Sequence, residues 1–157
     1  MESFLPNYFR PDELEALRYL QGRVLDKVLY TVWRNVADQT QPYALLEWVE
    51  LYFGDGEVLA LTSSEEEPRG LEIRPLNFGL EQTRVIQQFR GQVELERVDM
   101  SESPIWAGQI GSAVTAIGLV SFGEELYQNN LLHIEFESRR IEVSLNEDGL
   151  LVQVAET

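Results

Sequence analysis

Residues 46–61, which read LEWVELYFGDGEVLAL, decide the fold class of this chain. Apolar and aromatic residues that favour strands lie on both sides of Asp55-Gly56, a dipeptide typical of the two-residue turn of a β-hairpin. A turn of that kind places Phe53 opposite Val58. We therefore expect two antiparallel strands here. Because both faces of the first strand are mostly apolar, other elements must cover both of them.

Glu47 and Glu50 are the two acids within the first of these strands. A carboxylate without a partner is costly in apolar surroundings or has a raised pKa, which would suit one of the two acids of a hydrolase. The alternation of a strand, however, predicts that these two side chains lie on opposite faces. We therefore expect each of them to lie near a sheet edge or to pair with arginine, rather than to share an active site.

A second hairpin, near the end of the chain, resembles the first. Under a constant offset, apolar residues of the first hairpin fall on apolar residues of the second: Trp48, Val49, Leu51, Phe53 and Val58 on Leu131, Leu132, Ile134, Phe136 and Ile141. Under a nearly equal offset, Gly22 falls on Gly108 and Val28 on Val114. The pattern indicates an internal pseudo-repeat. The alternative is that two amphipathic hairpins align by their alternation alone.

The remaining sequence predicts one helix and several strands. Residues 11–21 predict a short helix, because Pro11 suits the first helical position and Gly22 suits a left-handed end. Strands are expected at 23–33, 71–74, 93–96, 131–137, 140–145 and 150–155, while 76–92 leave open whether a helix forms around 80–89. The sequence therefore predicts an α+β fold of mainly antiparallel sheet, built from two related hairpin units with an N-terminal helix packed on it. Residues 1–157 are expected to form a single domain.

Charge decides which partners this chain favours. Twenty-seven acidic residues against twelve Lys and Arg give a formal net charge of -15. Such a charge repels nucleic acids and anionic lipids, so neither a nucleic acid nor a membrane is expected as a partner. The start of the chain has no basic segment followed by an apolar run, and a cytoplasmic location is the expectation.

The sequence offers little catalytic chemistry. There is no cysteine, which excludes disulfides, thiolate metal sites and a cysteine nucleophile. Glycine-rich nucleotide-binding motifs are absent, and residues 144–149 fail the pattern of a calcium loop, so no cofactor and no metal is predicted. His133 is the only histidine, and we expect a partly exposed strand residue rather than a general base.

Residues 103–123 contain no charged side chain, a length that could cross a membrane. Four glycines and several polar residues argue instead for buried β structure. A small-molecule-binding module that uses this segment to line an apolar cavity is a further alternative. Trp106 is expected either as a core anchor or as an exposed aromatic residue at an interface.

We expect a non-enzymatic protein that binds another, basic, protein. The assigned partner-binding residues are Glu65, Glu66, Glu67 and Trp106, because three adjacent acids can dock a basic surface. In size, acidity and lack of catalytic motifs the chain resembles bacterial immunity and inhibitor proteins that neutralise basic toxins, a resemblance that implies an inhibitory function and covers no shared motif. A carboxylate-based hydrolase is the enzymatic alternative, and a homodimer through an open sheet edge is the alternative assembly.

Overall fold

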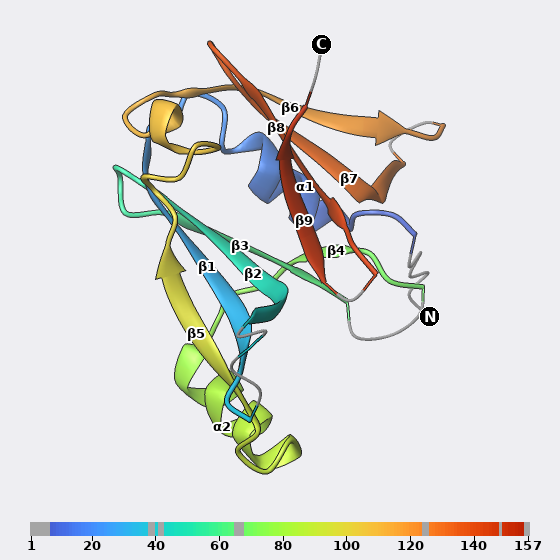
Figure 1. The fold of residues 1–157 in the computed structure, drawn as a ribbon. Coiled ribbons are helices and arrows are strands. Elements are labelled where there is room, and N and C mark those ends of the chain that lie inside the picture. The colour runs from blue at the N-terminus through green and yellow to red at the C-terminus, as the bar shows by residue number, and fades with distance from the viewer. Residues whose placement is uncertain are drawn as a thin grey trace.

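The computed structural model describes residues 7–37, 40, 43–64, 68–123, 126–147 and 149–155. It confirms an α+β fold with two antiparallel sheets and an N-terminal helix (Figure 1). Sheet 1 has five strands in the order β4 (Leu71–Ile73), β3 (Val58–Ser63), β2 (Tyr43–Phe53), β1 (Leu25–Asn35) and β5 (Val93–Asp99). Sheet 2 has four strands in the order β6 (Val114–Ser121), β7 (Tyr127–Phe136), β8 (Arg140–Leu145) and β9 (Leu150–Val154).

Two α-helices and one short 3-10 helix accompany the sheets. They are α1 (Pro11–Arg18), α2 (Phe78–Gln88) and η1 (Ala107–Gln109). The sequence left open whether residues 76–92 contain a helix, and α2 shows that they do. In α1, Glu13 accepts a hydrogen bond from the Arg10 backbone N–H at 2.9 Å, which satisfies one of the free donors at the start of the helix. Its second oxygen accepts the N–H of Ile73 at 2.9 Å, so this buried side chain also joins α1 to β4.

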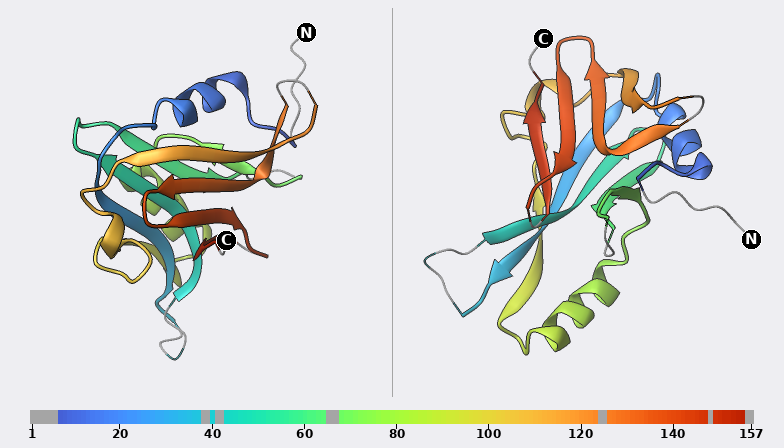
Figure 2. Two further views of the ribbon diagram at one scale, coloured as in Figure 1. Left: turned by 90° about the horizontal axis from the view of Figure 1, so that it is seen from above. Right: turned by 90° about the vertical axis from the view of Figure 1, so that its right-hand side faces the viewer.

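The core lies between the two sheets, which face each other with α1 beside them (Figure 2). Alternate residues of the strands point into it, among them Val49, Leu51 and Phe53 of β2 and Leu132, Ile134 and Phe136 of β7. Helix α1 adds Leu14 and Leu17 to the same cluster. In β7 the apolar alternation thus specifies which face of the strand is buried.

Sheet 1 is also covered on its other face, the outer face, where α2 packs. Among the described residues, the apolar side chains buried outside the main core are Trp48, Ala60, Val85 and Leu95. Val85 belongs to α2, and the Gln82 side chain of α2 bonds both the N–H and the carbonyl of Leu95. This arrangement explains why β2 is apolar on both faces, as the sequence indicated.

The register predicted for the first hairpin is wrong by one residue. Val58 lies opposite Tyr52 instead of Phe53, because the loop contains three residues, 54–56. The Phe53 N–H bonds the carbonyl of Glu57 at 2.9 Å, and Gly56 has a φ of +92°. A left-handed glycine closing a three-residue loop gives a bulge that a two-residue turn lacks.

The two halves of the chain are related by a local pseudo-two-fold axis. Val24 and Ala113 form an antiparallel bridge, and the hydrogen bonds around it occur in matching pairs. The pairs are Gly22 N–H to Val114 O with Gly111 N–H to Leu25 O, and Leu25 N–H to Ser112 O with Val114 N–H to Arg23 O. The glycine equivalent to Gly22 is therefore Gly111, with φ of +87° against +85°, and the predicted match to Gly108 is corrected.

The same equivalence extends through both sheets. Leu25 pairs with Phe53 and Val114 with Phe136, and both pairs are followed by a β-bulge. Farther along, β4 contacts β7 and β9 contacts β2. The pseudo-repeat is thus a structural one, in which α1 and β1–β4 correspond to the helical turn near 103–109 and β6–β9.

Candidate functional site on the uncovered sheet

Comparing the two halves shows where the second half has a free surface. In sheet 1, β5 covers the edge of β1 and α2 covers the outer face. In sheet 2, β6 is an edge strand, and no described helix packs on the outer face (Figure 1). Gln21, just after α1, bonds the Thr115 carbonyl at the start of β6. We therefore take the outer face of sheet 2, together with the β6 edge beyond Thr115, as the candidate site.

Burial confirms the contrast between the two outer faces. Trp48 and Glu50 of β2 are 1% and 3% exposed. Their equivalents in β7 are Leu131 and His133, and both are only half-buried. Because the strand positions are the same, the difference reflects the presence of α2 and β5 on one sheet.

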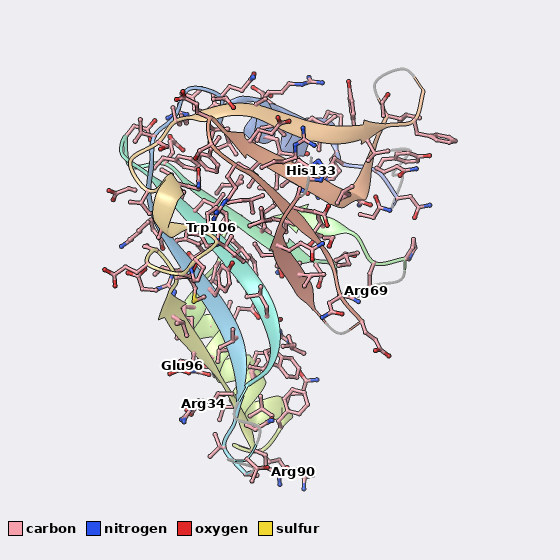
Figure 3. The ribbon with its side chains drawn as sticks, turned by 45° about the horizontal axis from the view of Figure 1, so that its top comes forward. Arg34, Arg69, Arg90, Glu96, Trp106 and His133 are labelled. Carbon is pink, nitrogen blue, oxygen red and sulfur yellow. The ribbon has the colours of Figure 1, made fainter. Side chains whose placement is uncertain are left out.

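A polar row crosses the outer face of sheet 2. Gly118, His133, Glu142 and Gln153 lie opposite one another on β6, β7, β8 and β9. His133 Nε2 lies 3.1 Å from Glu142 Oε1, and Gln153 Nε2 donates to Glu142 Oε2 at 2.7 Å. Figure 3 shows His133 on this sheet, away from the end where Arg34 and Arg90 lie.

Glu142 is an ionised member of this row. The hydrogen bonds donated by Gln153 and contributed by His133 lower the pKa of the Glu142 carboxyl, since both stabilise the charged form. The carboxylate is therefore charged at neutral pH and loses its charge only as the pH falls below its usual titration range.

Glu135 is the second carboxylate of the face and lies at its β6 side. Its Oε1 lies 3.7 Å from Arg140 Nη2, an exposed ion pair that contributes little stability. Its Oε2 lies 3.4 Å from the point where a Cβ on Gly118 would be. The missing side chain of Gly118 therefore leaves the β6 side of the Glu135 carboxylate accessible.

The equivalent place in sheet 1 shows how such a face can bind a cation. Glu50 accepts two hydrogen bonds from Arg97 Nη2, at 2.8 and 3.0 Å, and one from Tyr52 OH at 3.1 Å. Arg97 belongs to β5 and reaches over β1, which separates it from β2. A guanidinium delivered by an edge strand is thus the natural partner of a carboxylate two strands away.

The edge of β6 is less covered than that of β1. Val28 and Tyr30 of β1 are 0% and 8% exposed. Their equivalents Ile117 and Leu119 point toward the same core but are half-buried. No described strand lies beside β6, and these apolar side chains are in partial contact with water.

Of the residues assigned from sequence, Glu65, Glu66 and Glu67 lie outside the described residues. The loop that contains them is fixed where it leads into β4, because Arg69 donates to the carbonyls of Asn146 and Glu147, both at 2.9 Å. Arg69, which follows the acidic run in the sequence, is therefore bonded to the β8–β9 turn (Figure 3). Its part in partner binding stays a prediction.

Trp106 is fully buried, which agrees with the first of its two expected roles, a core anchor. Its indole N–H donates to Tyr30 OH at 2.7 Å, and burial raises the pKa of that hydroxyl (Figure 3). A part of Trp106 in partner binding stays a prediction, and it would act through the core, since the side chain has no exposed surface.

The expectation that Glu47 and Glu50 lie on opposite faces is wrong. Thr31 pairs with Trp48 but Val32 pairs with Leu46, so the register shifts at Glu47 and turns this side chain to the α2 side as well. There Glu47 accepts a hydrogen bond from the Trp33 indole and lies 3.9 Å from Arg84 of α2. The expected pairing of both acids with arginine is confirmed.

The remaining sequence predictions concern the uncharged segment 103–123, membrane crossing and metal binding. A strand does form at 114–121, which is β6, but Val114 is the one buried residue of that strand. Ile105, Ile110, Ile117 and Leu119 pack against the core and are half-buried. No helix in the described parts of the chain is long and apolar enough to cross a membrane. Within those same residues, no group of three His, Asp or Glu is placed to hold a metal ion.

Alternation along β7 places His133 and Glu135 on one strand face, but the sequence does not show that Gly118, Glu142 and the β6 edge belong to the same surface. Alternation within β8 would have placed Glu142 on the polar face. The cross-strand register, which joins it to His133, is visible only in the folded sheet.

No protein-family model, curated protein or solved structure matches the chain. The described architecture defines a two-sheet α+β protein with internal pseudo-two-fold symmetry, in which one sheet has an uncovered outer face that carries Glu135 and Glu142 beside Arg140 and His133.

Proposed function

We propose that the protein is a non-enzymatic, protein-binding protein that uses the outer face of sheet 2 to bind a basic partner. The observation that carries the proposal is the asymmetry between the halves: the face that α2 and β5 cover in sheet 1 is open in sheet 2 and presents Glu135 and Glu142. A net charge of -15 supports fast association with a positively charged surface.

An inhibitor of the immunity type, acting in the cytoplasm, is the kind of protein that fits these features. Such a protein needs a charged, preformed surface and no reaction chemistry. The acidic run 65–67 would add to the negative field around the fold.

The hydrolase alternative receives less support from the same residues. A glycosidase-type general acid needs a raised pKa so that it is protonated before the reaction. The pKa of Glu142 is lowered instead. The two acids that the sequence singled out, Glu47 and Glu50, are paired with Arg84 and Arg97.

The test is cross-linked capture from a lysate of the source organism with three matched baits at low and high salt. The baits are the wild-type protein, the double variant Glu135→Arg/Glu142→Arg, and the control Glu57→Arg/Glu102→Arg, whose two exposed acids lie outside sheet 2. We expect a basic protein that the wild type and the control retain at low salt and that the double variant loses. A fourth bait with Glu65, Glu66 and Glu67 changed to Gln should retain it more weakly at low salt.

Circular dichroism and thermal unfolding of each bait exclude loss of fold as the cause, and Glu135→Gln/Glu142→Gln provides a milder version of the face variant. The proposal is wrong if the double variant retains the same proteins as the wild type, or if retention does not depend on salt.

A further inference from the structure

The edge of β6 is occupied at its start, where Val114 bonds Gly22 and Arg23 and the Gln21 side chain donates to the Thr115 carbonyl at 3.2 Å. Farther along, at Ile117 and Leu119, no described segment pairs with it, and there the edge is preformed for pairing with another strand. In sheet 1, the N–H of Val28 donates to Ser101 Oγ at 2.9 Å and its carbonyl accepts the Met100 N–H at 2.8 Å, both on the side away from β2. Ile117 is the equivalent of Val28, since each pairs with the central core residue of the next strand, Ile134 or Leu51. The N–H and carbonyl of Ile117 therefore point away from β7, toward the open edge, and those of Leu119 do the same by alternation.

The chain itself contains the template for what such an edge accepts. The seven residues of β5 pair antiparallel with β1, with Leu29 opposite Asp99 and Thr31 opposite Arg97. In this position Arg97 extends over the outer face and makes its paired hydrogen bonds with Glu50. Backbone hydrogen bonds thus pair β5 with β1, and one arginine joins β5 to β2, the strand on the other side of β1.

In sheet 2, the edge of β6 corresponds to the edge of β1 that pairs with β5, but the acidic residues near it occupy different positions. Gly118 stands where β1 has Leu29, so a side chain that crosses β6 there meets no branched residue. Glu135 stands at the position of Tyr52, and its Oε2 faces Gly118. Glu142 lies beyond His133 on the next strand. A guanidinium entering over Gly118 would therefore meet one carboxylate at once and a second one farther across the face.

We propose that the edge of β6 binds an extended, arginine-containing segment of the partner protein as an added antiparallel strand. The side chains of this segment on the outer face of sheet 2 would include an arginine that crosses Gly118 to Glu135 and Glu142. The side chains on the core face would be apolar and would cover Ile117 and Leu119. This inference rests on the proposed function and names the partner segment and the mode of binding.

A second copy of the chain fits this edge less well than a basic segment. Pairing two β6 edges would extend one sheet into the other and join two molecules that each carry a net charge of -15. The outer faces would then meet with acids on both sides, and like charges across an interface oppose association. A basic segment avoids this repulsion and brings a further positive charge to Glu135 and Glu142.

The experiment titrates the intact protein with three seven-residue peptides, acetylated and amidated, at low and at moderate salt. VRVRVRV has the alternation of the proposed segment. VEVEVEV reverses its charge. VRPRPRV keeps its charge but lacks the backbone N–H groups and the extended pairing of a strand. Affinity is measured by calorimetry, and amide hydrogen exchange is followed by NMR.

We expect VRVRVRV to bind, with VEVEVEV and VRPRPRV at least about tenfold weaker. Binding should slow exchange of the outward amides of Ile117 and Leu119, while the Gly118 amide, which faces β7, changes little. The variant Glu135→Gln/Glu142→Gln should weaken VRVRVRV about tenfold, corresponding to the loss of charge-assisted hydrogen bonds at a partly exposed site, whereas Glu57→Gln should not.

Three outcomes overturn the inference. The first is equal binding of VRVRVRV and VRPRPRV, which would mean charge attraction without strand pairing and would leave the proposed function standing. The second is binding without protection of Ile117 and Leu119. The third is sedimentation showing a dimer whose formation protects these two amides, which would assign the edge to a second copy. Failure of the proposed function itself would appear separately, as retention of all partners by the face variant in the capture experiment.

Discussion

Gly70 and Gly149 mark the places where the two halves approach each other most closely. A Cβ on Gly149 would overlap the carbonyl oxygen of Leu46, and a Cβ on Gly70 would overlap the side chain of Asn129. Each glycine immediately precedes the last strand of its unit, and the residue it meets lies on an inner strand of the other sheet. Glycine is needed here for the absence of a side chain, since neither residue has a positive φ.

At this scale we predict that Gly149→Ala lowers the free energy of unfolding by about 1 to 3 kcal/mol, as expected for overpacking against a backbone atom that cannot move aside. Urea unfolding followed by circular dichroism measures the change. The control is Gly108→Ala, because a Cβ on Gly108 would meet no atom within 4 Å. Equal stability of the two variants would contradict the close packing at Gly149.

One ion pair connects strand β5 to strand β2, although β1 lies between them. Arg97 of β5 bonds Glu50 of β2, whose side chain is only 5% exposed, and the Arg97 guanidinium also lies 5.2 Å from the ring centre of Phe78 in α2. The pair therefore joins β5, β2 and the start of α2.

We predict that Arg97→Leu lowers the free energy of unfolding by about 2 to 4 kcal/mol, because it leaves the Glu50 carboxylate buried without its cation. Adding Glu50→Gln to this variant should restore part of the loss, since the neutral amide is less costly to bury. Chemical unfolding of both variants provides the measurement. In the control Arg34→Leu, which breaks an exposed pair with Glu94, we expect a loss below about 1 kcal/mol; a similar loss in both single variants would contradict the role of burial.

Elements were predicted better than their pairing. The helix at 11–21, the strands at 23–33 and 71–74 and the C-terminal meander all form, with ends displaced by a few residues. The register of the first hairpin and the direction of Glu47 were wrong, because a three-residue loop and a β-bulge each shift a strand by one residue. Local sequence favours a strand but does not specify such a shift.

At the scale of the whole molecule, charge acts on stability as well as on binding. With 27 acidic residues and 12 Lys and Arg, the folded chain holds many like charges close together. The ion pairs within sheet 1 offset only part of this repulsion.

We predict that adding salt stabilises the protein. Raising NaCl from about 10 to about 200 mM shortens the Debye length from roughly 30 to below 10 Å, so the free energy of unfolding should rise, by an amount on the order of 1 kcal/mol. Urea unfolding at each salt concentration provides the measurement, and KCl should act as NaCl does if the cause is screening. The variant with Glu65, Glu66 and Glu67 changed to Gln should show a smaller rise; a fall in wild-type stability with salt would contradict the prediction.

The sequence by itself determined the elements and the burial of the strands. Apolar alternation in 131–137 indicated which side chains of that strand are buried, and apolar residues on both faces of the strand before Asp55 indicated that both faces are covered. The Asp55-Gly56 turn indicated a hairpin, and the acidic composition indicated a negative net charge. These properties depend on neighbours in the chain, and a periodic pattern records them directly.

Only the tertiary structure decided where the second half is open. The two-fold relation depends on hydrogen bonds between residues as distant as Gly22 and Val114, and the sequence alignment placed Gly22 on the wrong glycine. The cover of sheet 1 by α2 and β5, and the free edge of β6 opposite it, likewise depend on which strands lie side by side. Pairing between distant strands is a property of the whole packing, because each strand could satisfy its backbone groups with more than one neighbour.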